Sequence, residues 1–156
     1  MVRILKLQYV GAFEVRSPRE RVYMFLTSPE KVAKAFPGVE KLEVLDENSF
    51  SVRATMGIGH LRGSMNFKLR FEEKKPHEYA KVVGRGTGLQ STADISLSFN
   101  LEDMEGDITR VRWSFEGNVG GLVGSIGGRI LDDVAKKLVD EVISNIKKAL
   151  EQLSIL

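Results

Sequence analysis

The sequence predicts an α+β fold in which a curved antiparallel sheet of about seven strands wraps around a long C-terminal helix. Three observations support this prediction. Apolar and polar residues alternate through the middle of the chain, an apolar stripe recurs at helical spacing in the last part, and a glycine-rich segment separates the two. The helix is the only segment long enough to cover the apolar face of such a sheet, so we expect the sheet to curl around it.

Composition limits the class of protein. A chain of 156 residues suits one domain spanning residues 1–156, and 42% hydrophobic residues suffice for a substantial core. The 23 basic and 21 acidic residues are spread along the chain, which makes nucleic acid a poor candidate partner. Because the chain has no cysteine and its start lacks a secretory signal pattern, we expect a cytoplasmic protein.

The first elements are predicted to be one strand and two short helices. The strand runs from Gln8 to Arg16. It meets Ser17-Pro18-Arg19-Glu20, which fits an N-cap, a proline at the first helical position and a capping-box acid. The second helix is expected to start at Ser28-Pro29-Glu30 and to end at Phe36-Pro37-Gly38.

From Glu40 onward the period of the pattern changes to two. The clearest strand runs from Leu61 to Glu72, where apolar and polar side chains alternate strictly. Similar alternation or β-rich composition marks residues 50–58, 79–87, 93–101 and 111–115. Turn-forming residues separate these runs, so we predict a long antiparallel meander with one apolar face.

Two sets of glycines have more than one explanation. Gly84, Gly86 and Gly88 share one face of a strand, which is compatible with a ligand cavity and with a bend in the sheet. Before the long helix, glycine implies either an irregular backbone or a need for empty space, and of these we favour empty space. The second set comprises Gly120, Gly121, Gly124, Gly127 and Gly128.

The long helix is predicted over residues 129–156, which contain neither glycine nor proline. Its charged residues fit a solvated face, with Asp132 and Lys136 in the favourable acid-first order. One stripe is expected to be buried against the sheet. It comprises Leu131, Val134, Ala135, Leu138, Val142, Ile146, Ala149 and Leu153.

A ligand pocket is predicted between the sheet and this helix, lined by apolar and aromatic groups. The candidate lining residues are Phe25, Phe36, Met56, Ile58, Met65, Phe67, Ile95, Leu97, Trp113, Phe115, Val123, Gly124, Gly127 and Leu131. Tyr9, Tyr79 and Trp113 each combine a ring with one hydrogen-bonding group, which suits the orientation of an amphiphilic ligand. For Trp113, core packing alone is the stronger interpretation.

No catalytic, metal or cofactor site is predicted. His60 and His77 lack the spacing of metal ligands, and surface positions explain both. The serines of the strands lack a nucleophile elbow, and the glycine-rich stretches lack the lysine of a phosphate-binding loop.

Four stretches carry a family resemblance over roughly Gly11 to Leu150. They are LTSPEKVAKAFPGVEKLE (26–43), GHLRGSMNFKLRFEE (59–73), GRGTGLQSTADISLSF (84–99) and VGGLVGSIGGRILDDVAKKLVDEV (119–142). The chain resembles the G-subunit family of carbon monoxide dehydrogenase, within the START-like and Bet v 1-like (SRPBCC) helix-grip superfamily.

The resemblance implies a cavity for a hydrophobic small molecule and a supporting role beside a molybdenum-containing dehydrogenase. Members of the family have been connected with membrane recruitment and with quinone carriage. Many bacterial members continue into a hydrophobic anchor, whereas this chain stops at Leu156, so the resemblance implies at most peripheral membrane contact here. Two alternatives stay open: an assembly factor that binds no ligand, and an enzyme similar to polyketide cyclases and aromatases.

Overall fold

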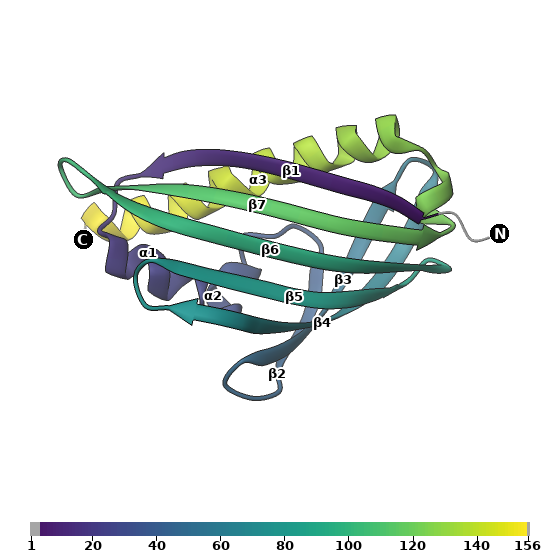
Figure 1. The fold of residues 1–156 in the computed structure, drawn as a ribbon, viewed down its shortest axis with the longest axis horizontal. Helices are drawn as coiled ribbons and strands as arrows, with labels where there is room; N and C mark the ends of the chain where they lie inside the picture. The colour runs from purple at the N-terminus through teal and green to yellow at the C-terminus, as the bar shows by residue number, and fades with distance from the viewer. Residues whose placement is uncertain (1–3, 156) are drawn as a thin grey trace.

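The computed structural model describes residues 4–155 and the side chains of residues 4–152. Seven strands form one antiparallel sheet in the order β1-β7-β6-β5-β4-β3-β2 (Figure 1). The predicted α+β architecture is confirmed. In chain order the elements are β1 (Ile4–Val15), α1 (Arg19–Leu26), α2 (Pro29–Ala33), β2 (Val39–Val44), β3 (Ser49–Ile58), β4 (Leu61–Lys75), β5 (Tyr79–Gly88), β6 (Ser91–Met104), β7 (Ile108–Gly121), the 3₁₀ turn η1 (Val123–Ser125) and α3 (Gly128–Ile155).

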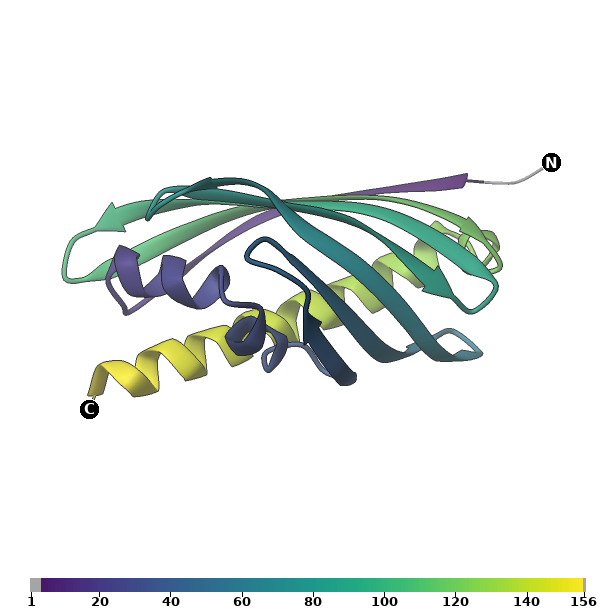
Figure 2. The same ribbon diagram turned by 90° about the horizontal axis from the view of Figure 1, so that it is seen from below.

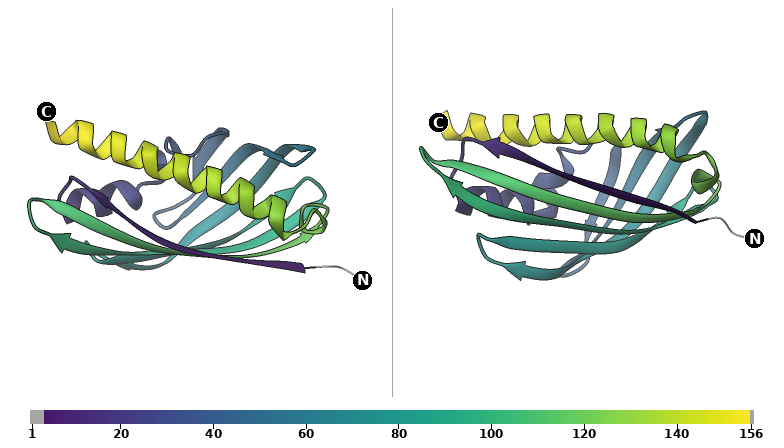
Figure 3. Two further views of the ribbon diagram at one scale, coloured as in Figure 1. Left: turned by 90° about the horizontal axis from the view of Figure 1, so that it is seen from above. Right: turned by 45° about the horizontal axis from the view of Figure 1, so that its top comes forward.

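The sheet curves, and α3 runs obliquely across its open side, as Figures 2 and 3 show. The main backbone contacts of α3 are with β1, β3 and α1. Because β1 is one edge of the sheet and β3 lies next to the other edge, the helix bridges the two sides of the curve. The central strands therefore face α3 from further away.

The strands alternate as the sequence predicts. On β6, Ala93, Phe99 and Leu101 are buried, whereas Asp94 and Asn100 are exposed. This burial defines an inward face, which is turned toward α3, and an outward face. Tyr9, Phe115 and Leu97 are paired neighbours across β1, β7 and β6, so their side chains share the inward face.

Two separate hydrophobic clusters hold the fold together. The main cluster joins α1 and the C-terminal half of α3 to one end of the inward face; its buried members are Val15, Val22, Tyr23, Phe25, Ala35, Phe50, Phe71, Ala80, Phe99, Leu101, Val111, Val142, Ile146 and Leu150. The second cluster joins η1 and the start of α3 to the other end; its buried members are Ile58, Ala93, Val119, Val123 and Leu131. The apolar stripe of α3 is thus divided between two cores, while Leu153 lies outside the described side chains.

The predicted capping box at the first helix is wrong. Pro18 occupies the N-cap position of α1, and no side chain caps it. The hydroxyl of Ser17 is buried and has no hydrogen-bond partner among the described residues. At α2 the predicted start holds, because the Ser28 side chain accepts a hydrogen bond from the Lys31 amide and Pro29 follows it. The helix ends at Ala33, before the predicted end at Phe36-Pro37-Gly38.

The glycines before α3 serve the backbone at two positions at least. Gly121 has a φ of +83°, and Gly127 has a φ of +108°, a region that residues with a Cβ rarely adopt. An irregular backbone, the less favoured of the two explanations, therefore accounts for both. In the sheet, a Cβ on Gly84 would lie 2.1 Å from the carbonyl oxygen of Lys68, and one on Gly86 would lie 2.4 Å from the ring of Phe67. These glycines permit close strand approach and ring packing.

Candidate functional site

A band of half-buried apolar side chains crosses the inward face between the two clusters. We name Tyr9, Met56, Phe67, Leu97 and Phe115 the central band. None of the five packs against either cluster. On β6, for example, Ile95 packs against the second cluster, Phe99 belongs to the main cluster, and Leu97 lies between them. This part of the inward apolar surface therefore belongs to neither core cluster.

The environment of the central band is almost free of polar groups. Among the described residues, no charged side chain of the sheet faces inward between the two clusters. Only Tyr9 and Trp113 bring polar side-chain atoms to this part of the face. Trp113 packs against the main cluster, and its indole N–H is buried without a partner among the described residues. A surface of this kind suits an uncharged, largely apolar ligand.

The hydroxyl of Tyr9 connects the band to the helix. It donates a hydrogen bond to Oδ1 of Asp132 on α3, at 2.5 Å. The Tyr9 ring stacks with that of Phe115, with the centroids 6.2 Å apart and an interplanar angle of 22°. Burial, followed by the hydrogen bond to Asp132 and the negative charge of its carboxylate, raises the pKa of Tyr9 to about 12. At neutral pH the phenol is therefore a hydrogen-bond donor.

Asp132 is a residue of the site that the sequence analysis assigned to the solvated face. It is half-buried, and among the described residues it forms no ion pair with Lys136 or any other cation. One signal was present in the sequence. Asp132 directly follows Leu131 of the apolar stripe and lies three residues before Ala135, so it borders the face that turns toward the sheet.

The predicted lining residues fall into three groups. Met56, Phe67, Leu97 and Phe115 come together in the central band. Ile58, Val123 and Leu131 are buried in the second cluster with Ile95 packed against them, and Gly124 is buried beside Val123. Phe25 lies in the main cluster, Phe36 and Trp113 pack against it, Met65 is buried outside both clusters, and Gly127 faces open space.

Two aromatic expectations need correction. Ala80 is fully buried on the inward face, so the preceding residue, Tyr79, points outward and does not join Tyr9 and Trp113. His77 lies in a turn as expected, but it is half-buried and meets the ring of Tyr23 edge-on at 5.6 Å between centroids. His60 is exposed, as predicted.

An open cleft of about 470 Å³ lies between α2 and β2. Phe36, Leu42, Val39 and Ala33 form its apolar lining with Gly38, and Glu30 and Lys34 are its charged residues. The volume falls in the range of roughly 300–1,000 Å³ that is usual for small-molecule pockets. Phe36 and Leu42 also pack against the main cluster, so the cleft lies directly beside that core.

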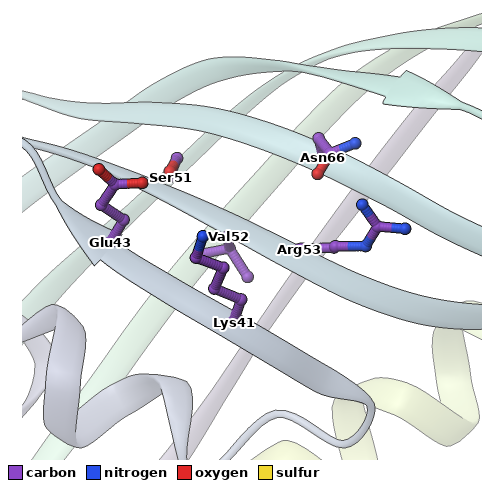
Figure 4. A pocket seen from close by; sticks show the side chains of 6 residues that line it. All are labelled: Lys41, Glu43, Ser51, Val52, Arg53 and Asn66. Atoms are coloured by element: carbon purple, nitrogen blue, oxygen red, sulfur yellow. The ribbon is translucent and has the colours of Figure 1, made fainter.

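A smaller depression, of about 180 Å³, is a poor candidate. Figure 4 shows its six lining side chains, which come from the three neighbouring strands β2, β3 and β4. Lys41, Glu43 and Arg53 among them are exposed and point to the outward face. This site is smaller than a typical ligand pocket and is mainly polar.

The part of the chain that the structure describes lacks two features. It contains no group of three or more His, Asp or Glu side chains that could hold a metal ion. No helix there has the length and apolar character needed to cross a membrane.

Comparison with known proteins gives a family and a fold. The family model for the G subunit of carbon monoxide dehydrogenase (CoxG) matches residues 11–151. No curated protein matches the chain. A conserved protein from Geobacillus kaustophilus has a similar structure, with a TM-score of 0.86 and 25% identity, over 94% of this chain and 96% of that one.

Two more distant structures show the fold alone. A START superfamily protein from Mycobacterium smegmatis aligns with a TM-score of 0.72 and 12% identity, over 94% of this chain and 98% of that one. The Zhui aromatase/cyclase from Streptomyces sp. R1128 aligns with a TM-score of 0.70 and 14% identity, over 95% of each chain. The expected START-like helix-grip fold is thereby confirmed.

Proposed function

Since the chain belongs to the CoxG family, the G-subunit family of carbon monoxide dehydrogenase, we propose that it binds a hydrophobic small molecule on the central band, between the sheet and α3. The family and the START-like fold are consistent with a role of this kind. The observation that carries the proposal is that five inward-facing side chains of the band are half-buried and pack against neither core cluster.

The physical reason is the unused apolar surface. Each square ångström of apolar surface removed from water contributes roughly 25 cal/mol, so half-buried aromatic and aliphatic side chains that belong to neither core cluster favour a guest. Met56 is unbranched and polarisable, which lets it adapt to the shape of that guest. The lining residues predicted from the sequence around the band, such as Ile95 and Trp113, would form its ends.

We propose the cleft between α2 and β2 as the entrance. Phe36 and Gly38 line it, which supports an opening of the chain near Pro37 and Gly38. Binding then needs no covalent step: the ligand moves from the cleft onto the band and displaces water from apolar surface. The glycine-rich segment before α3 is a second place where the chain could open, by movement of α3 away from the sheet.

The family to which the chain belongs supports a more specific ligand and a protein partner. We propose that the ligand is quinone-like and that the chain acts in the cytoplasm as an accessory to a molybdenum-containing dehydrogenase of the carbon monoxide dehydrogenase type. A pull-down from the source organism tests the partner. Recovery of the dehydrogenase polypeptides would support the accessory role, and their absence from the eluate would contradict it.

Ligand binding is tested with uncharged probes. Nile red and a short-chain naphthoquinone should bind the protein, and glucose, as a polar control, should not. Leu97→Trp should weaken binding about tenfold or more, because the larger ring fills the space over the band. Val10→Trp is the matched control, since Val10 is 79% exposed on the outward face of β1. Absent binding of both apolar probes, or equal loss in the two variants, would contradict the proposal.

A further inference from the structure

The charged group beside the central band comes from α3 and not from the sheet. Among the described residues, the sheet contributes no charged side chain between the two clusters, and the half-buried charged residue in the N-terminal half of α3 is Asp132. Its neighbour Asp133 is exposed and faces away. Within the described residues, Asp132 is therefore the carboxylate that borders the band, and it forms no ion pair with a cation.

Asp132 has hydrogen-bonding capacity to spare. A carboxylate offers about four acceptor positions over its two oxygens. The Tyr9 hydroxyl occupies one of them at Oδ1, and the described structure gives Asp132 no other partner. The pKa of Tyr9 of about 12 keeps this hydroxyl protonated, so it holds the carboxylate in place at neutral pH without adding charge.

We propose that the head of the bound ligand is an uncharged hydroxyl group, an alcohol or a phenol, that donates a hydrogen bond to Asp132; for a quinone-like ligand this is its reduced, hydroquinone form. The inference rests on the proposed binding function and adds the chemical class of the ligand. The apolar part of the ligand lies on Phe67, Leu97 and Phe115, and its hydroxyl group reaches Asp132 beside Tyr9. Lipids with an anionic head, such as fatty acids, are rejected, because their charge would meet a half-buried carboxylate that forms no ion pair among the described residues.

A matched series of ligands tests this selection. The compounds 4-octylphenol, 4-octylanisole and 4-octylbenzoate share the ring and the alkyl chain and differ in the head, which is a donor, a non-donor and an anion. Their dissociation constants are measured by isothermal titration calorimetry with the full chain at neutral pH. We expect the phenol to bind about tenfold more tightly than either of the others, the factor that one hydrogen bond to a charged group supplies.

Two variants assign the selection to one side chain. Asp132→Asn removes the charge at nearly constant shape, and it should bring the benzoate to within about threefold of the phenol, since the like-charge repulsion is gone. Asp133→Asn removes a charge from the adjacent, exposed position and should leave the wild-type order unchanged. Unfolding curves for both variants show whether the fold is retained.

The outcomes separate this inference from the proposed function. If the three compounds bind the wild type equally well, or the benzoate binds best, the inference is overturned while the binding function stands; this comparison needs no variant. An unchanged preference in a folded Asp132→Asn variant also overturns it. If none of the compounds binds, the binding function and the inference fail together.

Discussion

The indole of Trp113 lies directly against Gly11 of the neighbouring strand. A Cβ built on Gly11 would be 2.6 Å from Cζ2 and 2.8 Å from Cε2 of the ring. The two residues are paired across β1 and β7, and because Gly11 has no side chain, the indole of Trp113 occupies the space beside it. The ring is thereby fixed at the boundary between the main cluster and the central band.

The first prediction concerns Gly11→Ala. Alanine is better than glycine in a strand by roughly 0.5–1 kcal/mol, but overpacking costs roughly 1–3 kcal/mol. Because the new methyl group forces the indole to move, we expect a net loss of about 1 kcal/mol or more in unfolding free energy, measured by urea denaturation. The emission of Trp113, the only tryptophan, should shift in the folded variant.

Gly57→Ala provides the control for this change. A Cβ there would come no closer than 4.0 Å to Arg62, and no positive φ requires glycine. This variant should be as stable as the wild type, or more stable by up to about 1 kcal/mol through the unfolded state. An equal loss in the two variants would show that the ring contact is not the cause.

The second prediction concerns Tyr9→Phe. Loss of the hydrogen bond to Asp132 should lower the unfolding free energy by roughly 0.5–1.5 kcal/mol at neutral pH. The effect should depend on pH, because the pKa of Tyr9 is about 12 in the folded protein and 10.0 as the ordinary value. Because folding raises this pKa, protonated Tyr9 contributes its full stabilisation below about pH 10, and the contribution is lost as the pH rises toward 12.

The difference between wild type and Tyr9→Phe should therefore shrink between pH 10 and pH 12 in denaturation curves recorded at fixed pH values. Burial also raises the pKa of Tyr23, with the same sign, but that contribution is common to both proteins and cancels. A difference that stays constant over this interval would mean that the Tyr9 phenol titrates normally in the fold.

Regular periodicity made most of the fold predictable from the sequence. On β4 and β6 the strict alternation assigns the faces correctly, because a side-chain period of two leaves no choice once one face is apolar. The stretch from Tyr79 to Gly88 is different, since its apolar residues occur in both phases. In the structure Ala80 is buried and the larger ring of Tyr79 points outward. The register with β6 decides this, because Ala80 pairs with the buried Phe99 and Tyr79 pairs with the exposed Asn100.

The candidate site was predictable only in part. The sequence assigned Phe67, Leu97 and Phe115 to one face, but their position between two separate clusters depends on how α3 divides its stripe. Asp132 could not be assigned from spacing, because a residue at the border of a helical stripe can face solvent or a partner. The strand register and the helix placement together bring it to Tyr9.

The third prediction compares two phenylalanines on the same face. Phe99 is 7% exposed in the main cluster, whereas Phe115 is half-buried in the central band. Phe99→Ala should cost roughly 3–5 kcal/mol of unfolding free energy, and Phe115→Ala about half of that, since it leaves no closed cavity in a core. In contrast, Phe115→Ala should lower the increase in Tm that Nile red produces, relative to wild type. If Phe115→Ala costs as much as Phe99→Ala in the ligand-free protein, the band is core and not a binding surface.

The fourth prediction uses two buried hydroxyl groups in opposite situations. Thr109 is 0% exposed, and its hydroxyl donates a hydrogen bond of 2.7 Å to the carbonyl of Ser17. Thr109→Val keeps the shape and leaves that carbonyl without its partner, so we expect a loss of roughly 1–3 kcal/mol. The hydroxyl of Ser17 itself is buried without a partner among the described residues. Ser17→Ala should therefore be neutral or stabilising, because it removes an unpaired polar group from the interior.

Urea denaturation of both variants, with Thr92→Val on the exposed side of β6 as a control within about 0.5 kcal/mol of wild type, tests this pair. A hydroxyl group stabilises the join between β1 and α1 at Thr109, where its hydrogen bond is made, and weakens it at Ser17, where it has no partner among the described residues. A loss of more than about 1 kcal/mol in Ser17→Ala would mean that this hydroxyl is satisfied in solution, for instance by a buried water molecule. A neutral Thr109→Val would mean that the Ser17 carbonyl finds another donor, and the connection between β1 and α1 would then be held by packing around Val15 and Val22 alone.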